Sequence, residues 1–245
     1  MEGLLSTKAI PARERLIVAL DVAGGDLARK LVNELGDSVC FYKAGLELLM
    51  SGDFFDLVKW LRERDKKVFA DVKFFDVPET VKRAVAQVKG LGVTFVTAHG
   101  NDDILRAAVE SKGETKVLAV TVLTSLDKND LRDLGFACDI EALVLSRARR
   151  ALALGCDGVI SSGLEAAKLR QELGGHFLVV TPGIRAFSNL AARDDQKRTV
   201  TAEEAFLSGA DYIVVGRPIT RNAQPAKAAE ETQETIRRLF DRKRD

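Results

Sequence analysis

The chain has 245 residues, of which 46% are hydrophobic and 30% charged, a composition typical of an ordinary globular protein. The 37 basic and 36 acidic residues nearly cancel and leave a formal net charge of +1 at pH 7. This balance excludes a chain-wide positive field of the kind that gathers nucleic acid or anionic membrane. Any anion that the protein binds must therefore be held by a local group of residues.

The cysteines and the first residues carry no sign of export. Cys40, Cys138 and Cys156 are far apart and lack CxxC spacing, so neither disulfides nor a thiolate metal site is expected. The opening MEGLLSTKAIPARERL has no basic region followed by a long apolar run, and no segment approaches the about 18 apolar residues that span a bilayer. We expect a soluble, unprocessed protein of the cytoplasm, with no nucleic-acid or membrane partner.

Short runs rich in Val, Ile, Leu and Ala alternate with longer stretches of helical spacing along the whole chain. The apolar runs predict strands at 15–22, 39–46, 67–74, 93–100, 116–123, 158–162, 176–183 and 211–218. The amphipathic stretches predict helices at 26–35, 53–65, 78–91, 102–111, 140–154, 164–173, 202–209 and 225–240.

Eight strand and helix units predict an α/β protein with a (β/α)8 barrel, formed by residues 1–245 as a single domain. An open doubly wound sheet is the alternative. Two observations favour the barrel: no GxGxxG follows the first strand, and polar residues end most strands, where a barrel builds its site. No linker or low-complexity segment divides the chain.

Charged residues end the first three predicted strands. Asp71 and Lys73 lie two apart on one strand and share a face, while Asp21 and Lys43 hold comparable positions on the two strands before it. A rim salt bridge would be the structural explanation, but buried ion pairs stabilise poorly, and four such residues on successive strands favour a function. A lysine among carboxylates stays protonated and becomes a positioned proton donor.

The sequence DVPE, from Asp76 to Glu79, predicts a helix start. Asp76 is the expected N-cap, Glu79 would reach back in a capping box, and Pro78 suits the first turn. Capping does not exclude catalysis. Thr80 fits either an ordinary first-turn residue or a hydroxyl contact to a ligand.

Basic residues gather after the last two predicted strands. The connection 183–200 is long and polar, with Arg185 and Gln196 in it, and the last strand ends at Gly216 and Arg217. The glycine lets the backbone approach a ligand closely, and the arginine offers a fixed fork of donors. Each residue alone fits a solvated loop or a plain turn, but together, at the end where barrels bind phosphate, they predict a phosphate clamp.

The two histidines, His99 and His176, are too few and too far apart for a histidine metal site. His176 suits the start of a strand, and the role of His99 stays open. A carboxylate-bound Mg²⁺ is compatible with the composition.

Seven motifs, in matching order across nearly the whole chain, resemble orotidine 5′-phosphate decarboxylase of the bacterial type. They are ALD at 19–21, YKAG at 42–45, DVKFFDVPET at 71–80, VTVLTS at 120–125, TPGIR at 181–185, Gln196 and VGRP at 215–218. Related sugar-phosphate decarboxylases share the DxKxxD pattern, whereas TPGIR, the spaced glutamine and VGRP together make the resemblance specific.

The resemblance implies decarboxylation of orotidine 5′-phosphate to UMP, the last step of de novo pyrimidine synthesis, with no metal or organic cofactor. Lys73 would protonate C6 as CO2 departs, and Asp71 would lie against the substrate carboxylate. Asp76 and Thr80 would reach into the neighbouring subunit's site, so the active unit would be a homodimer.

The same resemblance assigns the substrate contacts. Asp21 and Lys43 would hold the ribose hydroxyls, and Thr124 the pyrimidine, although the adjacent Ser125 could share or take that role. The phosphate-side residues would be Arg185, Gln196, Gly216 and Arg217. The sequence departs from many bacterial members at two positions that are not catalytic in the motif, with Phe75 in place of His and Glu79 in place of Asn.

Two other functions stay open from the sequence. A Mg²⁺-dependent 3-keto-6-phosphogulonate decarboxylase would use the same DxKxxD pattern. A catalytically silent sugar-phosphate-binding barrel would bind UMP without turnover.

Overall fold

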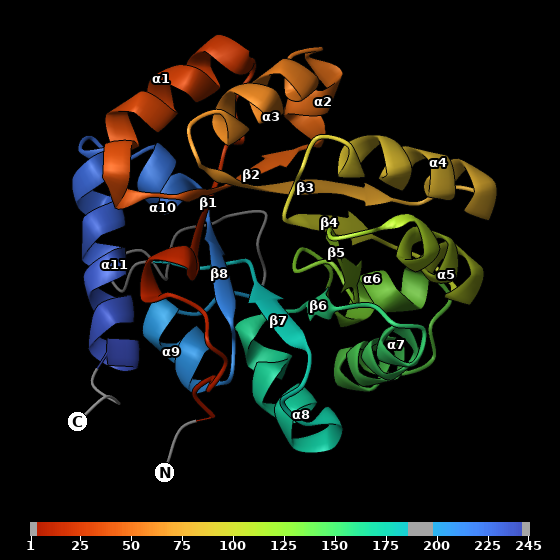
Figure 1. The fold of residues 1–245 in the computed structure, drawn as a ribbon. Helices are drawn as coiled ribbons and strands as arrows, with labels where there is room; N and C mark the ends of the chain where they lie inside the picture. Colours follow the sequence, from red (N-terminus) through yellow and green to blue (C-terminus); the bar gives the residue numbers. More distant parts are fainter. Residues whose placement is uncertain (1–3, 186–197, 242–245) are drawn as a thin grey trace.

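A computed structural model describes residues 4–185 and 198–241. In these residues eight parallel strands close into a barrel, each pairing with its neighbours in chain order and the eighth returning to the first (Figure 1). The strands are β1 (Leu16–Ala19), β2 (Phe41–Gly45), β3 (Lys67–Phe74), β4 (Phe95–Ala98), β5 (Lys116–Val120), β6 (Gly158–Ile160), β7 (Leu178–Thr181) and β8 (Tyr212–Val215). The predicted barrel is confirmed, and the open sheet is wrong because β1 pairs with β8.

Helices surround the barrel (Figure 1). The eight predicted ones are present with ends shifted by at most three residues: α1 (Gly25–Leu35), α3 (Phe54–Arg62), α4 (Pro78–Lys89), α5 (Asp102–Ser111), α7 (Ile140–Ala153), α8 (Gly163–Leu173), α9 (Ala202–Leu207) and α11 (Pro225–Phe240). None of the helices in residues 4–185 and 198–241 has the length and apolarity needed to cross a bilayer.

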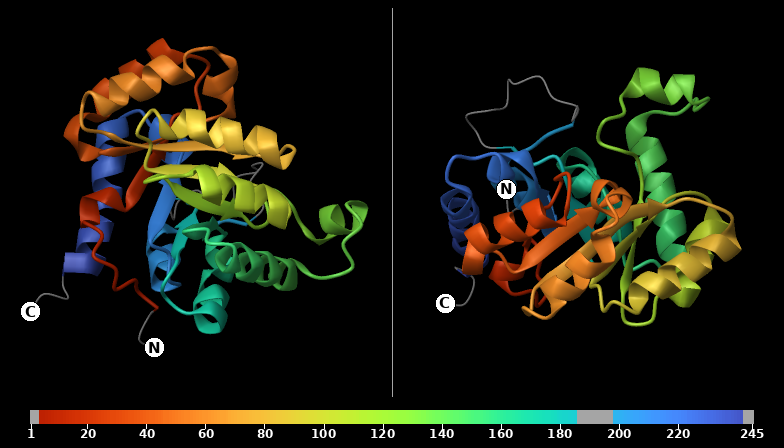
Figure 2. Two further views of the ribbon diagram at one scale, coloured as in Figure 1. Left: turned by 45° about the vertical axis from the view of Figure 1, so that its right-hand side comes forward. Right: turned by 90° about the horizontal axis from the view of Figure 1, so that it is seen from above.

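Short elements escaped the sequence pattern because they are too brief to show periodicity. They are the helices α2 (Leu46–Met50), α6 (Lys128–Asp133) and α10 (Arg217–Thr220), and the 3-10 turns η1 (Ala12–Glu14) and η2 (Gly36–Ser38). A capping box between Asp127 and Asp130 starts α6, which projects beyond the ring of helices (Figure 2).

Strand alternation divides the core into two parts. Along β1, Leu16 and Val18 pack outward against the helices, while Ile17 and Ala19 point into the barrel. The same alternation places four aromatic rings inside the barrel, with centroids 5.1–6.0 Å apart in the contacting pairs. They are Phe41, Phe69, Phe95 and Tyr212. These rings form a floor beneath the C-terminal mouth.

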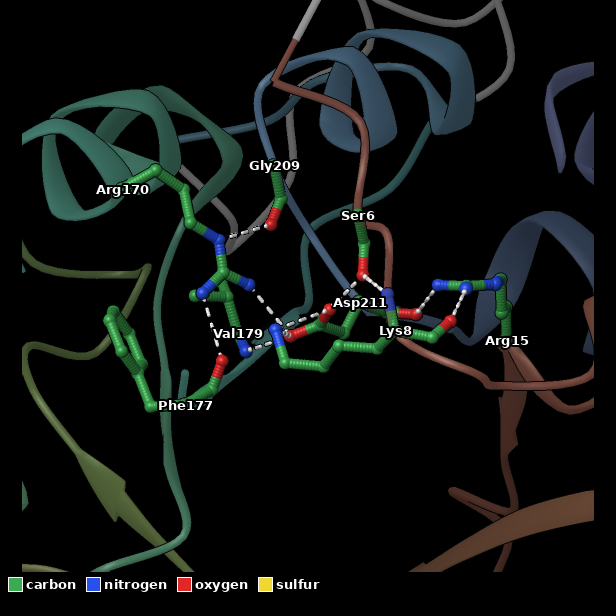
Figure 3. A network of polar contacts seen from close by, with 8 residues as sticks. All are labelled: Ser6, Lys8, Arg15, Arg170, Phe177, Val179, Gly209 and Asp211. Carbon is green, nitrogen blue, oxygen red and sulfur yellow. Dashed lines mark hydrogen bonds and ion pairs between the residues drawn. The ribbon is translucent and has the colours of Figure 1, made fainter. Parts of the chain in front are cut away.

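The opposite, N-terminal end of the barrel holds a fully buried carboxylate, Asp211, just before β8 (Figure 3). It accepts hydrogen bonds from Ser6 Oγ, from Lys8 Nζ at 3.1 Å, from Arg170 Nη2 at 2.7 Å and from Val179 N at 2.9 Å. These donors come from the N-terminal segment, α8 and β7. The carboxylate therefore ties three parts of the chain to the start of β8.

Arg15 extends this network (Figure 3). Its guanidinium donates to the carbonyls of Asp211 and Lys8, at 3.1 and 3.0 Å, and lies 3.7 Å from the Phe240 ring centroid in α11. Arg15 is 2% exposed. We call Ser6, Lys8, Arg15, Arg170 and Asp211 the Asp211 network.

Candidate active site

Alternating charges cross the C-terminal mouth of the barrel from β1 to β3. Lys43 Nζ lies 2.8 Å from Asp21 Oδ1 and 3.6 Å from Asp71 Oδ2, and Lys73 Nζ lies 2.9 Å from Asp71 Oδ1. In sequence these residues continue the alternation that turns the interior residues of their strands inward, which places them above the aromatic floor. The two aspartates and two lysines lie close together, as expected. We call Asp21, Lys43, Asp71 and Lys73 the mouth array.

The charges in the mouth array stabilise one another. Burial alone would raise the pKa of Asp71, but Lys43 and Lys73, with hydrogen bonds from Lys73 and Thr97, hold that pKa below its ordinary value. Burial alone would lower the pKa of Lys43, but Asp71 and Asp21 raise it above its ordinary value. At neutral pH the array therefore contains a carboxylate at Asp71 and an ammonium at Lys43.

The backbone of β3 is irregular at Lys73. β3 and β4 pair in regular register up to Ala70, and the register shifts before Phe74. Lys73 lies in this interval with φ of +51°, a left-handed conformation that is strained for a residue with a side chain, by roughly 1–2 kcal/mol. Thr97 of β4 holds the irregular backbone by accepting from Lys73 N at 2.9 Å and donating to Asp71 Oδ1 at 2.9 Å.

Sequence reasoning missed Thr97. The sequence indicates Thr97 only through its position. It lies two residues after the interior Phe95 on the strand next to β3, and residues two apart on a strand share a face. A buried threonine on a neighbouring strand is a common core residue, so this signal is weak without the register.

A cavity of about 600 Å³ opens at the mouth. Eight of the predicted site residues line it: Asp21, Lys43, Asp71, Lys73, Thr124, Arg185, Gly216 and Arg217. Ser125 lines it too, so the choice between Thr124 and Ser125 as the pyrimidine contact stays open. Arg221 and Asn222, which the sequence did not single out, also belong to the wall.

The arginines lie at the end of the cavity formed by the connections after β7 and β8. Arg185 is fixed through its backbone, since its N–H donates to Val200 O at 3.0 Å. Gly216 precedes Arg217 at the start of α10, and a Cβ there would lie 3.7 Å from Asp21 Oδ2, so the glycine leaves cavity space open. Gln196, the remaining predicted phosphate residue, lies outside the described residues.

Asp76 and Thr80 do not line this cavity. The predicted capping box is wrong: Val77 is the N-cap of α4, and within residues 4–185 and 198–241 Asp76 Oδ1 accepts only from the adjacent Val77 N, at 2.6 Å. Pro78 explains the difference, because it forces the preceding residue into an extended conformation and makes that residue the cap. Glu79 pairs with Arg83 instead, at 4.0 Å.

The histidines behave differently. His99 follows β4, its ring centroid lies 5.3 Å from that of Phe75, and its buried Nδ1 has no partner among the described residues. Burial lowers the pKa of His99, and the positive charges of Arg147 and Lys73 lower it further. His176 is exposed in the bend before β7, so the expectation that it starts the strand is wrong by two residues. Across the described chain, no group of three or more His, Cys, Asp or Glu side chains could hold a metal.

This combination defines a class of protein. A (β/α)8 barrel with charged groups at the C-terminal mouth and arginines after β7 and β8 is the arrangement of barrel enzymes that act on phosphorylated substrates.

Comparison with known proteins identifies the family. The model of the "Orotidine 5'-phosphate decarboxylase / HUMPS family" matches residues 14–232. The chain is 60% identical over 240 residues to the orotidine 5′-phosphate decarboxylase of Methylococcus capsulatus, covering 98% of this chain and 99% of that relative. The chain therefore belongs to this family of decarboxylases.

Two further proteins of the same name are also similar to this chain. The orotidine 5′-phosphate decarboxylase of Nitrobacter winogradskyi is 49% identical over 232 residues, which cover 94% of each chain. The crystal structure of the orotidine 5′-phosphate decarboxylase of Lactobacillus acidophilus superposes with a TM-score of 0.80 at 35% identity, over 91% of this chain and 99% of that one.

Proposed function

We propose that the cavity at the barrel mouth decarboxylates orotidine 5′-phosphate to UMP in de novo pyrimidine synthesis. The observation that carries the proposal is the mouth array, in which Lys73 and Asp71 face the same cavity as Arg185 and Arg217. Family membership and the names of the relatives at 60% and 49% identity support the same activity. The protein is a carboxy-lyase on this account.

The chemical step needs a proton donor at the reacting carbon. When the bond between C6 and the carboxylate breaks, its electron pair stays in an orbital in the ring plane, where the ring cannot delocalise it. On this proposal the Lys73 ammonium stabilises this carbanion and then donates its proton to C6. CO2 leaves, a C6–H bond forms, and the neutral lysine regains a proton from solvent.

Asp71 fixes that ammonium. Its lowered pKa keeps it ionised when the substrate arrives, so the substrate carboxylate would lie beside an anion and a cation together. As CO2 leaves, the carboxylate charge moves to C6 and the attraction to Lys73 is retained. This arrangement favours the transition state over the bound substrate.

The other cavity residues would hold the rest of the substrate. Asp21 and Lys43 suit the ribose hydroxyls, and Thr124 or Ser125 the pyrimidine. The phosphate would lie among Arg185, Gln196, Gly216 and Arg217. Binding energy from this remote group would order the reacting end of the site.

We also propose that the active unit is a homodimer in which Asp76 and Thr80 complete the partner's site. Asp76 stands between Phe75 and Val77, which are 68% and 62% exposed, and exposed apolar residues beside a functional position favour a protein interface. Mixing inactive Lys73→Ala and Asp76→Ala proteins should then restore part of the activity, because one site in a mixed dimer is intact. No recovery after verified subunit exchange would contradict shared sites.

A metal-free reaction is part of the proposal. Lysine ammonium groups already neutralise Asp21 and Asp71, which supports a site that needs no Mg²⁺. The alternative 3-keto-6-phosphogulonate decarboxylase would require Mg²⁺, and no structural observation favours it. A cytoplasmic location fits a biosynthetic enzyme whose cysteines are free.

The direct test follows the absorbance of orotidine 5′-phosphate with purified, EDTA-treated protein. We expect the absorbance to fall at the same rate with and without EDTA. Activity that disappears in EDTA and returns with Mg²⁺ would favour the alternative enzyme. UMP binding without any turnover would favour the silent binding protein.

A further inference from the structure

A buried arginine outside the mouth array joins two walls of the cavity. Arg198 Nη1 donates to Glu165 Oε1 at 2.6 Å, and Nη2 donates to the carbonyls of Val122 and Leu123 at 3.1 and 3.0 Å. The Arg198 and Glu165 side chains are 8% and 9% exposed. Arg198 precedes α9, Glu165 is in the first turn of α8, and the carbonyls follow β5, so this link spans the neighbouring strands β5, β6 and β7.

The carbonyls belong to the segment that carries the pyrimidine-side residues. Val122 and Leu123 line the cavity and lead directly into Thr124 and Ser125. Just before them, the carbonyl of Thr121 accepts from Arg147 Nη1. Three consecutive carbonyls are thus held by two arginine side chains, which leaves this segment little freedom to move.

The backbone next to Arg198 holds the phosphate-side wall. Val200 N donates to Gly183 O at 3.2 Å, and Val200 O accepts from Arg185 N at 3.0 Å. Both partners line the cavity. Arg198 therefore lies two residues from a backbone pairing with the phosphate-side wall, while its guanidinium holds the pyrimidine-side wall.

Stability alone is a weak explanation for this contact. A buried ion pair gains little over well-packed apolar residues, because desolvation offsets the attraction between the charges. The pair is also incompletely satisfied: Arg198 Nε and Glu165 Oε2 have no hydrogen-bond partner in the described part of the chain. A geometric role accounts better for a charged group that spans three strands.

We infer that Arg198 is a positioning residue that fixes the Thr124 segment relative to Gly183–Arg185. This inference rests on the proposed function, because it assigns the pyrimidine and the phosphate to these two walls. A substrate that carries both the pyrimidine and the phosphate contacts both walls at the spacing that Arg198 fixes. The binding energy of its phosphate then helps to order the reacting ring. Orotidine, the nucleoside without the phosphate, does not use it.

The test compares kcat/KM for orotidine 5′-phosphate and for orotidine in wild type and Arg198→Lys. Lysine keeps the charge and reaches Glu165, but it lacks the fork that holds two carbonyls as well. We expect kcat/KM for the phosphorylated substrate to fall about 10- to 100-fold, as small misplacements in active sites do, and the value for orotidine to change far less. Equal losses for both substrates, or no loss beside a lower Tm, would overturn the inference.

Arg170→Lys is the matched control. Arg170 is another buried arginine with a carboxylate at 2.7 Å, but it belongs to the Asp211 network at the other end of the barrel. Its substitution should lower Tm. It should leave unchanged the ratio of kcat/KM for orotidine 5′-phosphate to kcat/KM for orotidine. A changed ratio in this control would also overturn the inference, because it would show that any buried arginine has the effect.

Glu165→Gln decides the matter should Arg198→Lys fail to fold. Glutamine keeps an oxygen acceptor for Nη1 but removes the charge that orients the guanidinium. The ratio of kcat/KM for orotidine 5′-phosphate to kcat/KM for orotidine should still fall below the wild-type ratio, and an unchanged ratio would contradict the inference. Wild-type turnover is measured first, so that failure of the proposed function itself shows as no decarboxylation by the unmodified protein.

Discussion

Asp71 and Asp211 are carboxylates at opposite ends of one barrel, each with two cationic side chains beside it. Asp211 is fully buried, and the Asp71 side chain is 12% exposed. At Asp211 the partners are fixed from several sides: Arg170 also donates to the carbonyls of Gly209 and Phe177. At Asp71, Lys73 Nζ has no second hydrogen-bond partner among the described residues, its side chain is 39% exposed, and it faces the cavity. The comparison teaches that an ion pair surrounded by protein donors stabilises the fold, whereas one with an open side remains available to a substrate.

Lys73→Ala should give the largest effect. It removes the proton donor, so kcat should fall by about 10⁴-fold or more, while UMP binding stays measurable. Lys8→Ala is the matched control, because Lys8 pairs with Asp211 in the same way at the other end. We expect Lys8→Ala to lower Tm and to keep the activity of the folded protein. Full activity of Lys73→Ala in steady-state kinetics would contradict the difference between the Asp71 and Asp211 ends of the barrel.

Arg217→Ala should have the second-largest effect on activity. It removes a guanidinium at the predicted phosphate end, and kcat/KM should fall by about 10²-fold or more. Arg64→Ala provides a control, since that guanidinium lies 4.1 Å from the Trp60 ring and does not line the cavity. An unchanged kcat/KM in Arg217→Ala would refute the clamp role.

Thr97→Val should give a moderate effect at the mouth. It leaves the Lys73 N–H without its acceptor and Asp71 without one donor, at about 1–3 kcal/mol in stability, and kcat should fall about tenfold as Lys73 loses its support. Thr115→Val is the control: Thr115 is equally buried and donates to Val93 O at 3.0 Å, away from the cavity. Loss of activity in both variants would show that threonine packing, rather than the array, sets the rate.

His99 should give the smallest effect, visible as a pH dependence of stability. The unfolded chain takes up a proton near pH 6.5, whereas burial, Arg147 and Lys73 lower the pKa of His99 in the folded state. The contribution of His99 to the free energy of unfolding is fully present above about pH 6.5. It is lost as the pH falls toward the folded pKa, because the unfolded state then binds more protons. Urea unfolding at several pH values should show a shallower decline for His99→Leu than for wild type, with His176→Gln as the control. An identical decline in His99→Leu would contradict this.

The regular parts of the barrel followed from the sequence because apolar runs and amphipathic stretches report directly on burial. The same period of two placed Asp71 and Lys73 on one face, and strand order brought Asp21 and Lys43 beside them. Thr97 could not be found in this way, because its role depends on the register shift between β3 and β4. The capping box failed because Pro78 dictates the conformation of the residue before it, a local effect that outweighed the side-chain pattern.

Arg198 shows a second limit of the sequence. Its partners are 33 and 75 to 76 residues away, and no spacing rule connects an arginine before a helix to carbonyls that follow another strand. Such contacts arise only once the closed barrel places β5, β6 and β7 side by side.

A paired measurement on Asp71→Asn and Asp211→Asn tests the central claim most directly, with Tm and kcat determined for both. We expect Asp71→Asn to lose nearly all activity with little loss of Tm, since Lys43 keeps Asp21 and Lys73 can turn to solvent. Asp211→Asn should lose about 3–5 kcal/mol, or about 10 °C in Tm, and keep the activity of its folded fraction. Equal losses of Tm and kcat in both variants would contradict a division between a stabilising and a catalytic end.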